Sequence, residues 1–338
     1  MTENGGCGKA TQTPKVVAIG GGTGLSTLLR GLKAYTPHIV AIVTVADDGG
    51  SSGRLRRELG LLPPGDFRNC IAALADDEAL ITQLFQYRFG QGEGLDGHSF
   101  GNLFITALAA VTGSFERAIL EASRVLAVQG RILPSTLEDV TLVADLKVED
   151  GQAPSGLIRV QGESAIPKAG RPIERIFLRP EQVRAYPETV RAILEADLIV
   201  VGPGSLFTSI LPNLLVQDIR QAVEASSALK LYVCNVATQP GETDGFDVGK
   251  HVSVLQRHVG RGLFPYVLAN SSPFLSHWQP QWQPVALQFP RDGGYTVFTA
   301  DMMDRTAPWR HDSQKLANQI VHFHNHRTQR AAARPDRP

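Results

Sequence analysis

One stretch near the N-terminus, residues 15–52, constrains the fold more than any other part of this chain. An apolar run at 16–19 stops at Gly-Gly-Gly-Thr-Gly (residues 20–24), and leucines then recur at helical spacing from Leu25 to Leu32. A nearly continuous apolar run follows at 39–45 and ends in an acidic, glycine-rich loop. The order predicts a strand, a glycine turn, a helix and a second strand buried on both faces of a parallel sheet.

The glycine turn is the first candidate ligand site. A strand that enters a helix through glycines lets backbone N–H groups approach an anion closely, so Gly21, Gly22, Thr23 and Gly24 are candidate phosphate-binding residues. The alternative is a tight turn without a ligand. The arrangement resembles half of a Rossmann fold, but the nicotinamide fingerprint needs glycine or alanine where this chain has Leu25, which argues against a nicotinamide-dependent oxidoreductase.

The loop after the second strand brings acidic and hydroxyl side chains to the same place. Asp47, Asp48, Ser51 and Ser52 are therefore candidate ligand contacts. Two carboxylates repel a phosphate electrostatically. If they contact the ligand, they must either accept hydrogen bonds from a ribose or base, or hold magnesium that bridges to a diphosphate. We favour hydrogen bonding without an obligatory metal, and the structural alternative is that one carboxylate caps the next turn.

Polar residues also stand at later strand ends and helix starts, where a parallel sheet gathers its ligand-binding loops. Arg68 in a first helical turn opposes the helix dipole and so suggests an anionic partner, whereas Asp66 fits an N-cap as well as a ligand contact. His98 can equally be a core or capping residue, and an exposed Arg310 can simply be solvated. The remaining candidates are Asn69, Ser99, Asn102, Gly204, Ser205, Thr208 and Asn235.

Length and composition limit the classes of protein. The chain has 338 residues, with 33 basic and 33 acidic side chains, so it offers no overall charge for nucleic acid or an anionic membrane. Three widely spaced cysteines argue against a disulfide framework or a zinc site. No run approaches the roughly 18 apolar residues of a membrane span. We expect a cytoplasmic protein without a membrane span.

The pattern of apolar runs predicts one domain. We expect a Rossmann-like, doubly wound, mostly parallel α/β sheet at residues 15–326, with a β-rich insertion at about 130–180 and an edge strand at 285–289. The tails at 1–14 and 327–338 are expected to be disordered. His322 and His326 share a helix face at a spacing that can hold a metal, but a solvated helix end is the favoured interpretation.

Several segments together resemble the YvcK-like gluconeogenesis-factor family, which is related to CofD, the 2-phospho-L-lactate transferase of deazaflavin coenzyme synthesis. They are residues 20–30, 43–56, 63–70, 97–102, 130–136, 202–216 and 235–244. The resemblance extends from Lys15 to about Asn270, and its longer segments are more specific than the glycine turn. Phe207 stands where many relatives carry a tyrosine, so any contact of that hydroxyl should be absent here.

The resemblance implies a bacterial, cytoplasmic protein that binds UDP-sugars such as UDP-N-acetylglucosamine or UDP-glucose. It further implies a regulatory role in cell shape during growth on gluconeogenic carbon, with cell-envelope regulatory proteins as partners, and we expect a homo-oligomer. The alternative is a CofD-like transferase that uses a nucleotide-activated phosphate donor with magnesium. No cofactor is expected to be obligatory, and no catalytic residue is assigned.

Overall fold

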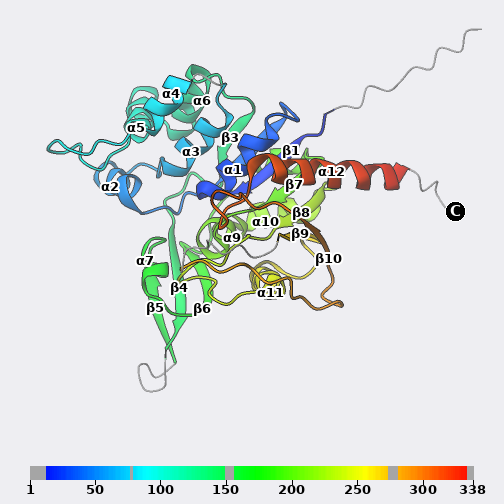
Figure 1. Cartoon of the computed structure of the whole chain (residues 1–338). Coiled ribbons are helices and arrows are strands. Elements are labelled where there is room, and N and C mark those ends of the chain that lie inside the picture. The colour runs from blue at the N-terminus through cyan, green and yellow to red at the C-terminus, as the bar shows by residue number, and fades with distance from the viewer. Residues whose placement is uncertain (1–12, 77–78, 149–155, 273–280, 333–338) are drawn as a thin grey trace, which may run out of the picture.

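The centre of the molecule is a seven-stranded, wholly parallel sheet (Figure 1). This computed structural model describes residues 13–76, 79–148, 156–272 and 281–332. The strands, in sheet order, are β10 (Thr296–Ala300), β9 (Tyr266–Asn270), β8 (Leu229–Val233), β7 (Leu198–Val201), β1 (Val16–Gly20), β2 (Ile39–Val43) and β3 (Arg131–Pro134). The predicted mostly parallel α/β fold is confirmed.

The strand order contains a topological switch next to β1. From β1 the chain adds β2 and β3 on one side, and after the insertion it adds β7, β8, β9 and β10 on the other. All five residues of β1 and all four of β7 are buried, as expected for strands covered on both faces. In open parallel sheets, ligands bind beyond the carboxyl ends of the two strands that flank such a switch. Here those strands are β1 and β7.

Helices cover both faces of the sheet. One layer contains α1, α3 and α12, which pack together, and the opposite layer contains α8, α9, α10 and α11 (Figure 1). The remaining helices α2, α4, α5 and α6 lie in a lobe next to α3. The bounds are α1 (Gly22–Leu32), α2 (Gly50–Leu59), α3 (Gly65–Leu74), α4 (Ala79–Gln86), α5 (Phe100–Thr112), α6 (Phe115–Val125), α8 (Pro187–Leu194), α9 (Leu211–Leu215), α10 (Gln217–Ala225), α11 (Val248–Val259) and α12 (Ser313–Ala332).

The insertion between β3 and β7 forms a small antiparallel sheet that projects from the main body (Figure 1). Its strands are β4 (Thr141–Lys147), β5 (Leu157–Gln161) and β6 (Ile173–Arg179), with β4 in the middle, and the short helix α7 (Ala165–Lys168) follows β5. On β4 the Asp145 carboxylate accepts hydrogen bonds from Arg159 and Arg175 on the two flanking strands. This ion-paired acid fixes the three strands to one another.

Several expected boundaries differ from the structure. Residues 131–134 belong to the main sheet as β3, so the insertion starts later than expected. The segment 285–289 is irregular, and β10 forms the sheet edge in its place. The last helix, α12, does not end at His326 but continues to Ala332. Residues 327–332 of the expected disordered tail are therefore helical. Residues 1–12 and 333–338 lie outside the described part of the chain.

In the described ranges no single helix is long and apolar enough to cross a membrane, and only α5 and α6 together, across a 120° bend, reach that length and composition.

Candidate functional site

A cleft of about 330 Å³ opens at the carboxyl edge of the sheet, where β1 and β7 end side by side. It lies at the topological switch, the expected place for a ligand. Its walls come from the glycine turn after β1, the loop after β7, the loop after β8, the insertion and the segment before α12. The lining residues are Gly21, Gly22, Thr23, Gly24, Thr27, Glu163, Pro203, Gly204, Ser205, Thr208, Ser209, Asn235, Val236, Ala237, Gln239, Glu242, Trp282, Trp309, Arg310 and His311.

The glycine turn needs its glycines for close approach. Helix α1 begins at Gly22, whose φ of +61° lies in the left-handed region, and the N-cap Gly21 supplies no side chain to cap the helix. A Cβ built on Gly24 would lie 2.4 Å from the carbonyl oxygen of Pro203 in the facing loop. The two loops therefore meet backbone to backbone, and after Gly22, whose N–H bonds to Asp66, the start of α1 has N–H groups that can face the cleft.

The loop after β7 is held by polar side chains. Asn235 follows β8, accepts the Gly204 N–H at 3.1 Å and donates to the Gly204 carbonyl at 2.8 Å. Ser205 caps η1 (Leu206–Ile210), a π-helical turn, by accepting the backbone N–H of Thr208 at 3.2 Å. The Thr208 hydroxyl in turn donates to Ser205 Oγ at 2.7 Å. The loop thus has a fixed shape with hydroxyl groups along the cleft.

One buried amide joins the two loops. Asn213 on α9 is fully buried, and its Nδ2 donates to the carbonyl of Gly20 at 3.0 Å and to that of Ser209 at 2.8 Å. Gly20 ends β1, whereas Ser209 belongs to the loop after β7. Asn213 thus adds a side-chain link between the two phosphate-binding candidates, beside the pairing of β1 with β7 and the close approach of Gly24 to Pro203.

Buried acids lie under and beside the cleft. Asp66, in the first turn of α3, accepts the Gly22 N–H, and burial together with the nearby Asp47 raises its pKa to about 7. Burial, then the charges of Asp47 and Asp66, raises the pKa of Glu163 to about 8. Burial also raises the pKa of Glu242, against the hydrogen bonds that its carboxylate accepts. Protonation of Asp66 and Glu163 near neutral pH reduces the negative charge at the cleft and so helps it to accept an anion.

The alternative role of Asp66 as an N-cap is wrong, because the N-cap position of α3 is Pro64 and Asp66 lies inside the first turn. A Cβ on Gly21 would lie 2.6 Å from Asp66 Oδ2. Asp66 therefore supports the glycine turn from below and makes no part of the cleft lining.

The acidic pair after β2 lies outside the cleft lining. Asp47 accepts the Gly49 N–H at 2.8 Å, and burial is the largest effect that raises its pKa. Asp48 accepts the Ser164 N–H at 2.8 Å and so connects this loop to the insertion. Asp47 therefore caps the following turn, as the structural alternative predicts for one carboxylate, whereas the backbone partner of Asp48 lies in the insertion.

A second polar group surrounds the start of α2. The residues expected in a loop at 51–52 are the first turn of this helix. His98 Nδ1 lies 2.9 Å from Ser51 Oγ, which also accepts Asn102 Nδ2 at 3.1 Å, and Ser99 caps α5 by accepting the Asn102 N–H. These buried side chains bond to one another, although Asn102 Oδ1 has no hydrogen-bond partner among the described residues, and none of them lines the cleft.

Arg68 and Asn69 belong to neither group. Arg68 is buried, donates to Asn69 Oδ1 at 2.9 Å and packs against Gly101 at the start of α5. Of the expected site residues, the structure brings Gly21, Gly22, Thr23, Gly24, Gly204, Ser205, Thr208, Asn235 and Arg310 together in the cleft. It places Asp47, Asp48, Ser51, Ser52, Arg68, Asn69, His98, Ser99 and Asn102 outside its lining.

Sequence reasoning missed several lining residues as site candidates. Glu163 comes from the insertion, and Trp282 and His311 come from irregular segments without a motif. A partial signal was present for His311, since it directly follows Trp309 and Arg310, an aromatic and a cation together before a helix.

The described residues provide no ready-made magnesium site. Among them no group of three or more His, Cys, Asp or Glu side chains is arranged to hold a metal ion. The carboxylates of Asp47 and Asp48 each accept a backbone N–H.

Fold and cleft together define a Rossmann-like α/β protein with two glycine-containing loops at its topological switch. The model of the family described as 2-phospho-L-lactate transferase CofD matches residues 16–320, so the chain belongs to the CofD family, within which its relatives are gluconeogenesis factors.

Named relatives cover most of the chain. The gluconeogenesis factor of Bacillus subtilis is 54% identical over 260 residues, which cover 77% of this chain and 80% of the relative. That of Listeria monocytogenes is 45% identical over 296 residues, covering 88% and 87% respectively. A crystal structure of a Bacillus halodurans protein of the UPF0052 family superposes with a TM-score of 0.83 at 43% identity, covering 91% of this chain and 99% of that one.

Proposed function

We propose that this protein binds a UDP-sugar, such as UDP-N-acetylglucosamine or UDP-glucose, in the cleft between β1 and β7. The observation that carries the proposal is the pair of facing loops, Gly21–Gly24 after β1 and Gly204–Thr208 after β7, held together by Asn213. Backbone N–H groups at helix starts and small hydroxyl side chains suit two adjacent phosphates. A cleft of about 330 Å³ also has the size of a small-molecule site.

The second part of the proposal is regulatory. The protein is inferred to sense the nucleotide-sugar in the cytoplasm and to act on cell-envelope synthesis through a protein partner, as a homo-oligomer, so that cell shape is maintained on gluconeogenic carbon. The family relationship to gluconeogenesis factors supports this role. The satisfied hydrogen bonds of Asp47 and Asp48 support ligand binding without an obligatory metal.

Binding is tested by calorimetric titration of the protein with UDP-N-acetylglucosamine and UDP-glucose. Arg310 is exposed and lines the cleft, so Arg310→Ala should fold normally and lose a charge-assisted contact of about 1.5–3 kcal/mol, or roughly 10- to 150-fold in affinity. Arg291→Ala is the matched control, because Arg291 is exposed and outside the cleft lining. Absence of binding of both sugars at millimolar concentration would overturn the proposal.

The transferase of the CofD family remains the second candidate, and the family match is the observation that favours it. Incubation with UDP-sugar and magnesium separates the two functions. A regulatory protein leaves the ligand intact, whereas a transferase without its acceptor slowly transfers the activated group to water and releases a uridine nucleotide. Titration of UDP-sugar into the wild type and Asp47→Asn, each with magnesium and with EDTA, tests the metal requirement. Affinity that collapses on chelation would favour the transferase.

A further inference from the structure

The cleft has an aromatic wall, formed by Trp282 and Trp309. The two indole planes are inclined by only 12°, and their centroids are 6.5 Å apart. Both side chains are half-buried, so part of each ring faces the cleft. Flat aromatic faces of this kind bind nucleobases by stacking, whichever base is present.

His311 provides an unused acceptor next to these rings. It is buried and lines the cleft, and its Nε2 is closed to solvent and has no hydrogen-bond partner among the described residues, so a ligand donor reaches it only when a neighbouring side chain moves. The ring also hydrogen-bonds to the Cys234 carbonyl, and burial lowers its pKa to about 4. Because Nε2 is unpaired, Nδ1 carries the proton that is donated to Cys234. In this neutral tautomer Nε2 can only accept.

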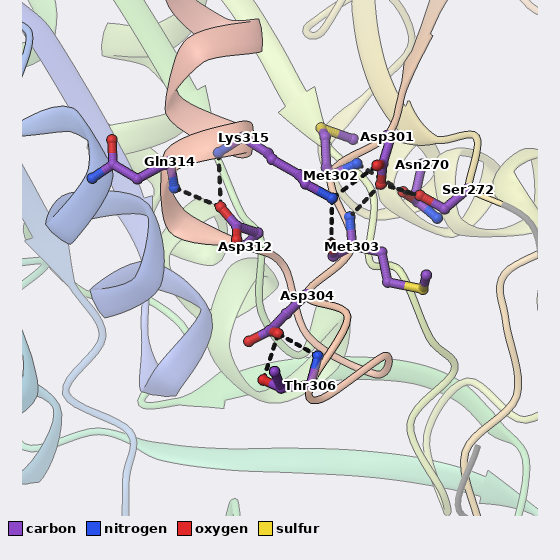
Figure 2. A network of polar contacts seen from close by, with 10 residues as sticks. All are labelled: Asn270, Ser272, Asp301, Met302, Met303, Asp304, Thr306, Asp312, Gln314 and Lys315. Carbon is purple, nitrogen blue, oxygen red and sulfur yellow. Dashed lines mark hydrogen bonds and ion pairs between the residues drawn. The ribbon is translucent and has the colours of Figure 1, made fainter. Parts of the chain in front are cut away.

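The segment that carries Trp309 and His311 is rigidly attached to the sheet edge (Figure 2). Asn270 at the end of β9 accepts the Met302 N–H at 3.0 Å. Lys315 on α12 donates to Asp301 Oδ2 at 2.8 Å and to the Met303 carbonyl at 3.0 Å.

Two further aspartates order the rest of this segment, as Figure 2 shows. Asp304 accepts both the N–H and the hydroxyl of Thr306, and Asp312 accepts the N–H groups of Gln314 and Lys315 at the start of α12. The Trp309 side of the wall is therefore organised before a ligand arrives, which reduces the entropy cost of binding.

We propose that this wall is the nucleoside subsite of the cleft: the base stacks on the indoles of Trp282 and Trp309, and a hydrogen-bond donor of the nucleoside meets Nε2 of His311. The inference rests on the proposed function, because it assigns the nucleoside end of the nucleotide-sugar that the glycine loops hold by its diphosphate. A buried acceptor without a partner is costly, and a nucleoside donor removes that cost in the complex. The donor is either the imide N–H of uracil or a ribose hydroxyl.

The aromatic half of the proposal is tested with Trp309→Ala and Trp309→Phe. Loss of a stacking ring should weaken UDP-N-acetylglucosamine binding about 5- to 150-fold in the alanine variant, while phenylalanine retains most of the affinity. Phe289→Ala is the control, because Phe289 is an exposed aromatic residue outside the cleft lining. Two of the three tryptophans line the cleft, so ligand should also change the intrinsic fluorescence of the wild type.

The histidine half is tested first from the ligand side, in the wild type, and then in a variant. UDP, N3-methyl-UDP and 2′-deoxy-UDP are titrated into the wild type and into His311→Phe. We expect one of the two modified nucleotides to bind the wild type at least tenfold more weakly than UDP, and the same modification to have no effect in His311→Phe. The sensitive ligand identifies the donor as imide or ribose.

The outcomes separate this inference from the proposed function. If UDP-sugars bind but Trp309→Ala keeps wild-type affinity, or if both modified nucleotides bind the wild type like UDP, the nucleoside subsite is wrong and the UDP-sugar cleft stands. If no UDP-sugar binds the wild type, both are overturned.

Discussion

Replacing Asn213 with leucine tests whether the two loops of the cleft are one structural unit. The substitution keeps the side chain's approximate volume but removes the donors to the carbonyls of Gly20 and Ser209. The Gly20 carbonyl still accepts the Thr44 N–H at 3.2 Å. The substitution also removes the buried Asn213 Oδ1, which has no hydrogen-bond partner among the described residues. Each of the two lost hydrogen bonds contributes about 0.5–1.5 kcal/mol, so we expect a loss of about 1–3 kcal/mol.

Urea denaturation followed by circular dichroism measures this loss as a lower midpoint with an unchanged slope. Asn318→Ala is the matched control, because Asn318 is an exposed asparagine on α12 and should change the free energy of unfolding by less than about 0.5 kcal/mol. Asn213 does not line the cleft, so any weakening of UDP-sugar binding in Asn213→Leu must come from movement of the loops. Stability within 0.5 kcal/mol of the wild type would refute the role of Asn213 as their connection.

Three further predictions follow from the geometry and charges. Gly24→Ala should destabilise by about 1–3 kcal/mol in thermal unfolding, because its Cβ meets the facing loop's backbone, whereas Gly90→Ala, with open space around it, should not. Glu163 has a raised pKa, so its contribution to stability is complete below pH 4.5 and is lost as pH rises towards 8. Glu163→Gln should therefore gain stability relative to the wild type over that range, and a difference in unfolding free energy that does not change with pH would contradict the burial of this acid. Hydrogen bonding by Arg159 lowers the pKa of Asp145, so Asp145→Asn should lower the free energy of unfolding by about 1–3 kcal/mol at pH 7. This difference should shrink as pH falls below about 3.8 and the wild-type carboxyl protonates, and a difference independent of pH would contradict the prediction.

Much of the fold follows from local patterns in the sequence. The apolar runs of β1 and β2 and the spaced leucines of α1 each fall within a short stretch of sequence. The secondary structure of these elements can therefore be predicted without tertiary information. The order of strands in the sheet depends on long-range pairing, which no local window contains. Strand β3 shows this limit, because its four residues end in a proline and only their pairing with β2 makes them part of the main sheet.

The candidate site also has one part that local sequence predicts and one part that depends on tertiary structure. The glycine loops were predictable, because glycine after a buried strand has a direct conformational reason. Glu163, Trp282 and His311 were not, because the docking of the insertion and of two irregular segments brings them to the cleft. Asp48 and His98 stand in polar motifs that the sequence singles out, but their hydrogen bonds are made with distant parts of the chain, which spacing along the chain does not reveal.

The most direct test of the account is a crystal structure with bound UDP-N-acetylglucosamine. The account predicts that the diphosphate lies between Gly22–Gly24 and Gly204–Thr208, at the ends of β1 and β7. Density for the nucleotide elsewhere, for example in the separate cavity beside Lys250 and Arg257, would contradict the assignment of the β1–β7 cleft as the nucleotide-sugar site.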